Sequence, residues 1–291
     1  MFGEIFIFIH DDRVVMKLEI DVSLDPTLGC GQAHRWIKKG DAWEGVLGKD
    51  LVILREKDGY VECEGTDDKD MVLNYLRHRD DLDTIYDSIS DDPFVRELAS
   101  ACPGLRILKQ EPWECTATYL LATNANVKRI GAMVESVCRT FGRDLGGRWS
   151  FPSPEEILRR AEHIGSCRLG YRDTRLIELA EKVADNVIVP EDLAKMDHIE
   201  CRDALMEING VGNKVADCIS LFSFGHLNAF PIDARIENVL RERYGITGSY
   251  RKLSAFAERR FGEYAGYAQE LLYHCETILG SQAQVGGSQP I

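Results

Sequence analysis

The run Ile208-Asn209-Gly210-Val211-Gly212-Asn213-Lys214, followed by Phe230-Pro231-Ile232-Asp233, decides the fold of this chain. Residues 201–208 and 213–224 flank the glycines with apolar residues at helical spacing, which predicts two helices that each bury one face. A tight glycine turn therefore joins two helices. An amine lies at the start of the second helix, and a carboxylate lies beyond its end.

The glycine turn has the chemistry of a phosphate site. Gly210 and Gly212 permit positive φ and a close approach by another backbone. The first amides of the helix that begins near Gly212 lack intrahelical partners, and they lie at the positive end of the helix dipole. Such a site positions a nucleic-acid backbone without distinguishing its bases.

Each feature also has an ordinary structural explanation. Gly-Val-Gly occurs in plain helix–helix connections, and Lys214 could be an exposed lysine in a first helical turn. Asp233 is a plausible N-cap for the segment 234–243. The combination of the three favours a functional site.

Several stretches, in collinear order, carry a resemblance to one family. The run 208–236 resembles the helix-hairpin-helix, Gly/Pro-rich loop and aspartate of base-excision DNA glycosylases, and the 8-oxoguanine DNA glycosylase branch in particular. Further stretches resemble that branch: GCGQAHRW (29–36), LKQEPWECTATYLLATNANVKRI (108–130), LGYRDTR (169–175) and YAGYAQELLYH (264–274).

The resemblance implies an α+β fold, with an N-terminal twisted antiparallel sheet followed by a mostly helical helix-hairpin-helix glycosylase domain. We expect an N-terminal β domain with short helices over 1–105. A helical glycosylase domain should follow over 106–280, with the helix-hairpin-helix at about 200–224, and then a flexible tail over 281–291. Strand-like runs lie at 2–9, 14–20, 43–46, 51–55 and 60–64. Helical patterns cover 71–77, 93–101, 114–122, 127–141, 154–164, 173–184 and 255–279.

Lysine at position 214 implies a bifunctional glycosylase/lyase within this superfamily. Lys214 would attack C1′ of the damaged nucleotide, expel the base and form a Schiff base, and Asp233 would stabilise positive charge at the sugar. The amine must be uncharged to attack, and burial or a positive helix end favours that form. A glycosylase for another oxidised or alkylated base, and a non-catalytic DNA-binding helix-hairpin-helix protein, are the alternatives.

The resemblance also assigns a base pocket. The Gly31 carbonyl would accept N7–H of 8-oxoguanine, Gln269 would read the Watson–Crick edge, and Cys218 and Tyr273 would sandwich the base. Taken singly, Cys218 and Tyr273 could be plain packing residues and Gly31 a turn glycine.

A second group would contact the rest of the DNA. Asn124, Arg129 and Arg172 match residues that contact the estranged cytosine, and Tyr171 matches the wedge in the kinked duplex. Phosphate contact or solvated surface is the alternative for the two arginines. The DNA-backbone residues would be Gly210, Val211, Gly212 and Arg235.

Three positions depart from the family pattern. His34 replaces a common Phe, Ala125 replaces an asparagine, and Arg235 replaces a typical histidine. These changes affect the expected substrate breadth more than the reaction class.

Composition sets outer limits. The 291 residues are 44% hydrophobic and 29% charged, and no apolar run approaches the roughly 20 residues of a membrane span. The start does not resemble a signal peptide. The nine cysteines are scattered without a C-x-x-C pair, which favours reduced thiols and predicts no metal, iron–sulfur cluster or other cofactor. We expect a monomer without membrane contact, cytoplasmic (nucleoid-associated in a prokaryote) or nuclear.

The net charge of −13 opposes DNA binding unless the charges are segregated. Residues 56–97 are strongly acidic. Basic residues gather along the chain near the proposed site: Lys128, Arg129, Arg168, Arg172, Arg175, Lys214, Arg235, Arg241 and Arg243. We therefore expect a basic face on an acidic body, binding double-stranded DNA that contains 8-oxoguanine.

Overall fold

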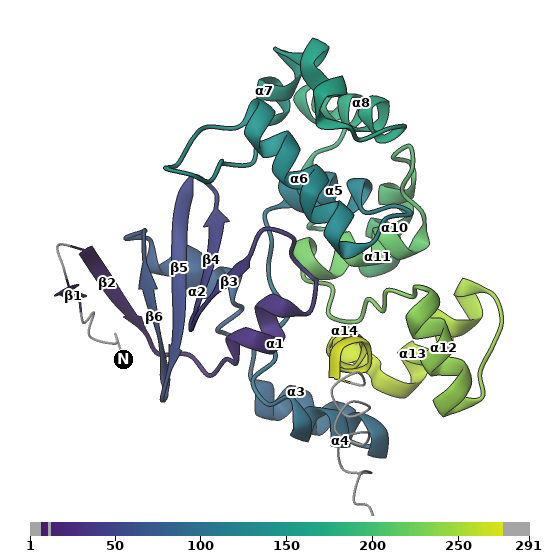
Figure 1. Ribbon diagram of the computed structural model, residues 1–291. Helices are drawn as coiled ribbons and strands as arrows, with labels where there is room; N and C mark the ends of the chain where they lie inside the picture. Colours follow the sequence, from purple (N-terminus) through teal and green to yellow (C-terminus); the bar gives the residue numbers. More distant parts are fainter. Residues whose placement is uncertain (1–6, 11–12, 276–291) are drawn as a thin grey trace, which may run out of the picture.

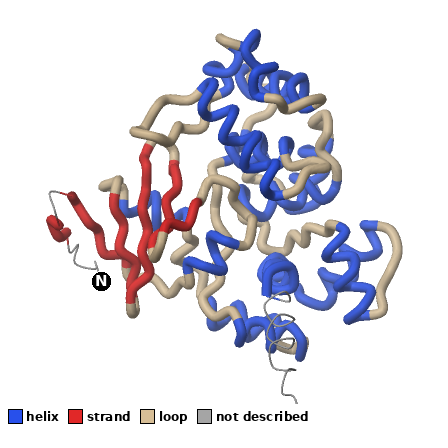
Figure 2. The backbone as a smooth tube through the Cα atoms, viewed as in Figure 1, coloured by secondary structure: helices blue, strands red, loops and turns tan. Residues whose placement is uncertain are grey.

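An antiparallel sheet forms one side of the protein, and helices fill the other (Figures 1 and 2). The computed structural model describes residues 7–10 and 13–275. The strands lie in the order β1-β2-β6-β5-β4-β3. Their bounds are β1 (Ile7–His10), β2 (Arg13–Leu18), β3 (Ile37–Lys39), β4 (Ala42–Leu47), β5 (Asp50–Lys57) and β6 (Tyr60–Glu64). This confirms the α+β prediction with its N-terminal antiparallel sheet.

Alternation and turn chemistry fix the register of the central strands. Along β5 and β6, Val52, Leu54, Val61 and Cys63 are buried while their neighbours are more exposed, as expected for a sheet with one covered face. The turn between these strands pairs Lys57 with Tyr60 and places Gly59 at a φ of 77°, where glycine has no steric penalty.

The helices follow the sheet and mostly begin with a side-chain cap. Asp68, Asp81, Asp92, Glu111 and Asn126 each accept a first-turn backbone N–H. The bounds are α1 (Leu24–Gly29), α2 (Lys69–Tyr75), α3 (Leu82–Ile89), α4 (Pro93–Ala101), α5 (Pro112–Leu121), α6 (Val127–Phe141), α7 (Pro154–Leu158), η1 (Ala161–Cys167), α8 (Arg172–Ala184), α9 (Pro190–Leu193), α10 (His198–Met206), α11 (Asn213–Ile219), η2 (Ser220–Phe224), α12 (Ala234–Tyr244), α13 (Tyr250–Phe261), η3 (Gly262–Tyr264), α14 (Ala265–Glu270) and η4 (Leu271–Cys275).

Two hydrophobic cores organise these elements. The smaller core joins the sheet with α1 and α2. The larger core begins at Leu82 and joins α3 and α4 with the helices that follow, up to Leu272. The helices α3 and α4, which lie before residue 105 in the chain, therefore pack with the C-terminal helices rather than with the sheet.

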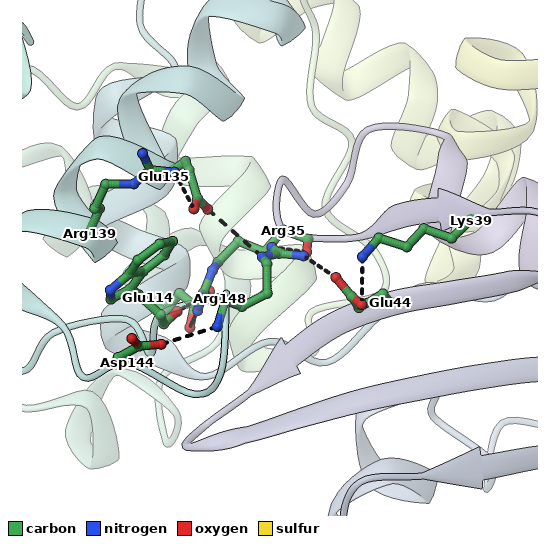
Figure 3. A network of polar contacts seen from close by, with 10 residues as sticks. Arg35, Lys39, Glu44, Glu114, Glu135, Arg139, Asp144 and Arg148 are labelled. Atoms are coloured by element: carbon green, nitrogen blue, oxygen red, sulfur yellow. Dashed lines mark hydrogen bonds and ion pairs between the residues drawn. The ribbon is translucent and has the colours of Figure 1, made fainter.

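A polar network ties the sheet to the helices (Figure 3). Arg35 donates to Glu114 of α5 at 3.2 Å, and Arg148 donates to the Arg35 carbonyl at 2.9 Å and to Glu44 of β4 at 3.4 Å. Arg35 and Arg148 are buried, so each needs these partners to offset lost hydration. The network therefore links Arg35 to α5 and, through Arg148, to β4.

Some predicted elements differ in extent. The predicted helix 255–279 is interrupted near Gly262, whose φ of 60° ends α13, and the chain resumes as η3, α14 and η4. The predicted helix 213–224 ends in the π-helical turn η2. The strand β3 and the helices α1, α3 and α9 were not predicted. Most of strand 2–9 and the tail 281–291 lie outside the described residues.

The cysteines correct one expectation. Cys30, Cys63, Cys115, Cys138, Cys167, Cys201 and Cys218 are free thiols. Cys102 is disulfide-bonded, so the prediction of reduced thiols throughout is wrong at that position. Spacing along the chain does not tell which thiols the fold brings together. Within the part of the chain that the structure describes, no helix is long and apolar enough to span a bilayer.

Candidate active site

A cavity of about 340 Å³ lies between the loop after α1 and helices of the larger core. Its walls come from the loop after α1, from α5 and α6, from α11, from the start of α12, and from α14 and η4. It contains each residue that the sequence assigned to catalysis or base recognition: Lys214, Asp233, Gly31, Cys218, Gln269 and Tyr273. Residues far apart in the chain are therefore brought to one site.

The glycine turn places Lys214 at the start of α11. Gly210 has a φ of 93°, and the N–H of Val211 bonds the Ile208 carbonyl at 2.9 Å to close the turn. Gly212 has an ordinary φ of −108°. It occupies the N-cap position of α11, where it provides no side-chain hydrogen bond to the helix. Of the two glycines, Gly210 is thus the one that needs positive φ. The first amides of α11 receive no side-chain cap.

Lys214 lies in a mixed electrostatic environment. It is close to Cys218, one helical turn further on, and its Nζ lies 5.3 Å from the centroid of the Tyr119 ring. Cys218 and Asp233 hold the pKa of Lys214 above its ordinary value even though burial opposes this. Lys214 therefore carries a proton in the unliganded protein, contrary to the expected lowering by burial. Burial raises the pKa of Cys218 to about 11, so Cys218 is a thiol at neutral pH.

Asp233 has two roles in the structure. It is the N-cap of α12 and accepts the N–H of Ile236 at 2.9 Å, as the structural explanation predicted. Its carboxylate also lines the cavity and acts on the charge of Lys214. The cap hydrogen bond therefore holds in place the carboxylate that acts on the amine.

A buried network behind the cavity supports this pair. Asp217 of α11 is fully buried and bonds the Nε2 atom of His198 at 2.8 Å and the Tyr250 hydroxyl at 2.6 Å. Tyr250 in turn accepts the N–H of Ile232 at 3.2 Å. The helix that carries Lys214 is thus connected to the segment that carries Asp233.

Gln32 anchors the loop that contains Gly31. Its amide donates to the carbonyls of Thr27 and Arg106 at 2.8 Å each, and its side-chain oxygen accepts the N–H of Leu108 at 2.8 Å. Gly31 has a φ of 95°, with no atom within 4 Å of where a Cβ would lie. The loop is therefore held rigidly while Gly31 stays open to the cavity.

His34 stands between two cavities. It lines the active-site cavity and a second one of about 590 Å³, which lies toward Trp36 and Tyr75. Neither ring nitrogen has a hydrogen-bond partner within the described residues. Burial, together with the charge of Lys214, lowers the pKa of His34 to about 4.

Comparisons with known proteins agree with this geometry. Residues 14–116 match the family model of the 8-oxoguanine DNA glycosylase N-terminal domain. The chain is 31% identical to the N-glycosylase/DNA lyase OGG1 of Arabidopsis thaliana, over 93% of this chain and 82% of the relative.

The chain belongs to the 8-oxoguanine DNA glycosylase family. It is also 27% identical to the N-glycosylase/DNA lyase of Saccharomyces cerevisiae, over 89% of this chain and 85% of that one. The solved structure of MBOgg1 with a low-affinity DNA ligand superposes with a TM-score of 0.87 at 29% identity, covering 96% of this chain and 100% of the other. The protein is thus an N-glycosylase/DNA lyase of this family.

Three of the four residues assigned to the opposite strand of this glycosylase's substrate, namely Asn124, Tyr171 and Arg172, lie together. Asn124 adopts a φ of 52° and donates to the Tyr171 hydroxyl at 3.3 Å. Tyr171 is 50% exposed, as a wedge requires, and the guanidinium of Arg172 lies 4.4 Å from its ring centroid. Arg172 is buried and donates to the carbonyls of Leu169 and Thr123. Arg129 is exposed near the start of α6.

Arg235 lies at the rim of the cavity. Its guanidinium is 4.7 Å from the ring centroid of Tyr273, one of the two residues assigned to sandwich the base. Arginine in place of the histidine expected from the resemblance therefore places a permanent positive charge beside Tyr273 of the cavity wall.

One cavity residue was missed at the sequence level. Glu270 directly follows Gln269 and is buried against the same cavity. Its signal was a single acidic residue between Gln269 and Leu271 in the mostly apolar run 265–273. Within the described residues, no group of three or more His, Cys, Asp or Glu side chains is placed to hold a metal ion.

Proposed function

We propose that this protein removes 8-oxoguanine from double-stranded DNA, preferentially opposite cytosine, and cleaves the strand through a Schiff base on Lys214. The observation that carries the proposal is the shared cavity. One space of about 340 Å³ holds the half-buried amine of Lys214, a carboxylate and the residues assigned to base recognition. A nucleotide flipped out of the duplex would be enclosed there, as base-modifying enzymes require.

In the first chemical step the neutral amine of Lys214 attacks C1′ and the C1′–N9 bond breaks. Asp233 then stabilises the positive charge that develops at the sugar. Ring opening gives the Schiff base, and loss of a C2′ proton allows β-elimination of the 3′ phosphate. Because Lys214 is protonated at rest, a proton must leave it before the attack.

The base is distinguished by hydrogen bonding. The Gly31 carbonyl accepts N7–H, a proton that guanine lacks, and Gln269 pairs with the Watson–Crick edge. The Gln269 side-chain oxygen is buried and has no hydrogen-bond partner within the described residues, which suits an acceptor that waits for the lesion.

The duplex is held outside the cavity. The turn Gly210-Val211-Gly212, with Arg235, contacts the DNA backbone, because amides at the start of α11 have no side-chain cap. Tyr171 wedges the duplex, and Asn124, Arg129 and Arg172 contact the estranged cytosine.

Borohydride trapping tests the nucleophile. Wild-type protein should form a covalent adduct with an 8-oxoguanine:cytosine duplex, and Lys214→Gln should not. Lys252→Gln, on the exposed face of α13, is the matched control and should trap like wild type. An adduct in Lys214→Gln would remove Lys214 from this role.

A panel of lesion duplexes tests the substrate. Faster release of an alkylated purine or an oxidised pyrimidine than of 8-oxoguanine would favour another glycosylase of the superfamily. Binding without any adduct or base release would favour a non-catalytic DNA clamp.

A further inference from the structure

Glu270 is a buried carboxyl group that the proposed mechanism leaves unused. It is 4% exposed and lines the active-site cavity. Its Oε2 atom has no hydrogen-bond partner in the part of the chain that the structure describes. A buried, partly unsatisfied carboxylate is costly, and such groups concentrate at functional sites.

The surroundings of Glu270 connect it to the nucleophile. Lys214 supplies positive charge to it and the Cys30 thiol favours its ionised form, while Asp233 opposes its ionisation. The titratable groups facing it come from several elements: Cys30 after α1, Tyr119 of α5, Lys214 and Cys218 of α11, Asp233 at the start of α12, and Tyr273 of η4.

The other acidic groups are less suited to take a proton from Lys214. Cys218 is a thiol at neutral pH and has no anion to offer. Asp233 accepts the N–H of Ile236 and is already engaged as the N-cap of α12. Burial raises the pKa of Glu270 to about 7, which suits proton exchange at neutral pH.

We propose that Glu270 is the proton acceptor that converts the ammonium group of Lys214 into the attacking amine. This inference rests on the proposed role of Lys214 as the nucleophile. The Glu270 carboxylate takes one proton from the ammonium, and the electron pair of that N–H bond stays on nitrogen. The amine then forms the bond to C1′ while the C1′–N9 pair leaves with the base.

The proton can return in the same turnover. The Glu270 acid lies in the cavity that encloses the base, next to Gln269, and gives its proton to the base that departs as an anion. The carboxylate is thereby regenerated. In sum, one proton moves from Lys214 to the released base, and no further reactant is needed.

The pH dependence of two reactions tests this role. Base release from an 8-oxoguanine:cytosine duplex and strand cleavage at a preformed abasic site are measured in single turnover from pH 5.5 to 9.5. Wild-type rates should rise with pH through an apparent pKa near 7. Glu270→Gln should lose that rise and slow both reactions on the order of 10²-fold at pH 7.5. Glu270→Asp, which keeps a carboxyl group, should retain the rise.

The outcomes separate the two proposals. Absence of a borohydride adduct with wild type would refute Lys214 as the nucleophile, and Glu270 with it. If wild type forms the adduct but Glu270→Gln keeps the wild-type pH profile, only the role of Glu270 is overturned. Slower base release with unchanged abasic-site cleavage would also overturn it, because Glu270 would then act on the base rather than on Lys214.

Discussion

Tyr250 donates its hydroxyl hydrogen to the fully buried Asp217 at 2.6 Å. The same oxygen accepts the backbone N–H of Ile232, the residue before Asp233. Asp217 belongs to the helix that begins with the Lys214 turn. A single hydroxyl therefore connects the two segments whose relative position defines the active site.

Tyr250→Phe removes this connection while keeping the ring. The variant should lower the free energy of unfolding by about 1–3 kcal/mol, because Asp217 and the Ile232 N–H lose a buried partner. Single-turnover base release should fall, with lesion-DNA affinity nearly unchanged. Urea denaturation and rapid quench measure the two effects. Tyr60→Phe, on strand β6 away from the site, is the control and should match wild type in both.

Substitutions of Asp233 distinguish its role as the N-cap of α12 from its proposed role in base release. Asn is as good an N-cap as Asp, so Asp233→Asn should keep the stability of α12 while base release drops on the order of 10²-fold. Asp233→Ala should lose the same activity and, in addition, about 1 kcal/mol of stability. Equal activity of Asp233→Asn and wild type would show that the carboxylate serves only the helix.

His34→Phe should change the acid stability of the protein. The folded state keeps His34 neutral down to a pKa of about 4, whereas the unfolded chain takes up the proton near the ordinary histidine pKa of 6.5. The stabilisation is therefore fully present above pH 6.5 and is lost as the pH falls toward 4. The loss amounts to about 3 kcal/mol. The free energy of unfolding of wild type and of His34→Phe is measured by denaturation at pH 7 and pH 4. Wild type should lose about 3 kcal/mol more than His34→Phe between the two pH values.

The two turn glycines should respond differently to alanine. Gly210 has a φ of 93°, and a Cβ there would lie 2.7 Å from Arg175, so Gly210→Ala should cost about 2 kcal/mol of stability. Gly212 has an ordinary φ and nothing within 4 Å, so Gly212→Ala should cost less than about 1 kcal/mol. Thermal unfolding of the two variants gives the comparison, and equal losses would contradict the assignment of strain to Gly210.

Removal of Arg129 tests the opposite-base contact. Arg129→Ala should reduce the preference for cytosine about 10-fold, the value of one lost base contact. Cleavage at a preformed abasic site should be unaffected. Rates with each of the four bases opposite the lesion provide the measurement, and Arg139→Ala, further along α6, serves as the control.

The sequence predicted an element correctly where the interactions that define the element lie within a short stretch of the chain. Helix α6 matches its predicted bounds because Asn126 caps it and its apolar stripe runs without a break. The predicted helix 255–279 failed at Gly262, because helical periodicity continues on both sides of a residue with positive φ. Glu270 was missed for a similar reason, since its importance comes from the cavity rather than from its neighbours in the chain.

Electrostatic expectations were less reliable than positional ones. Proximity of Lys214 to Asp233 followed from the motif, but its protonation depends on Cys218 and on the depth of burial. Arg172 is assigned to the estranged cytosine by resemblance, and the sequence did not indicate that its guanidinium bonds the carbonyls of Leu169 and Thr123. The protonation of Lys214 and the hydrogen-bond partners of Arg172 depend on several segments of the chain at once, so no single stretch of sequence encodes them.

The position of Gln32 suggests how this scaffold can acquire new substrates. The loop it anchors brings Gly31 and His34 to the cavity, while Lys214 and Asp233 belong to separate elements that line the same cavity. Exchanges in the loop can therefore alter which damage is admitted and leave the bond-breaking apparatus intact. Evolution could tune selectivity and turnover in this lineage almost as independent traits.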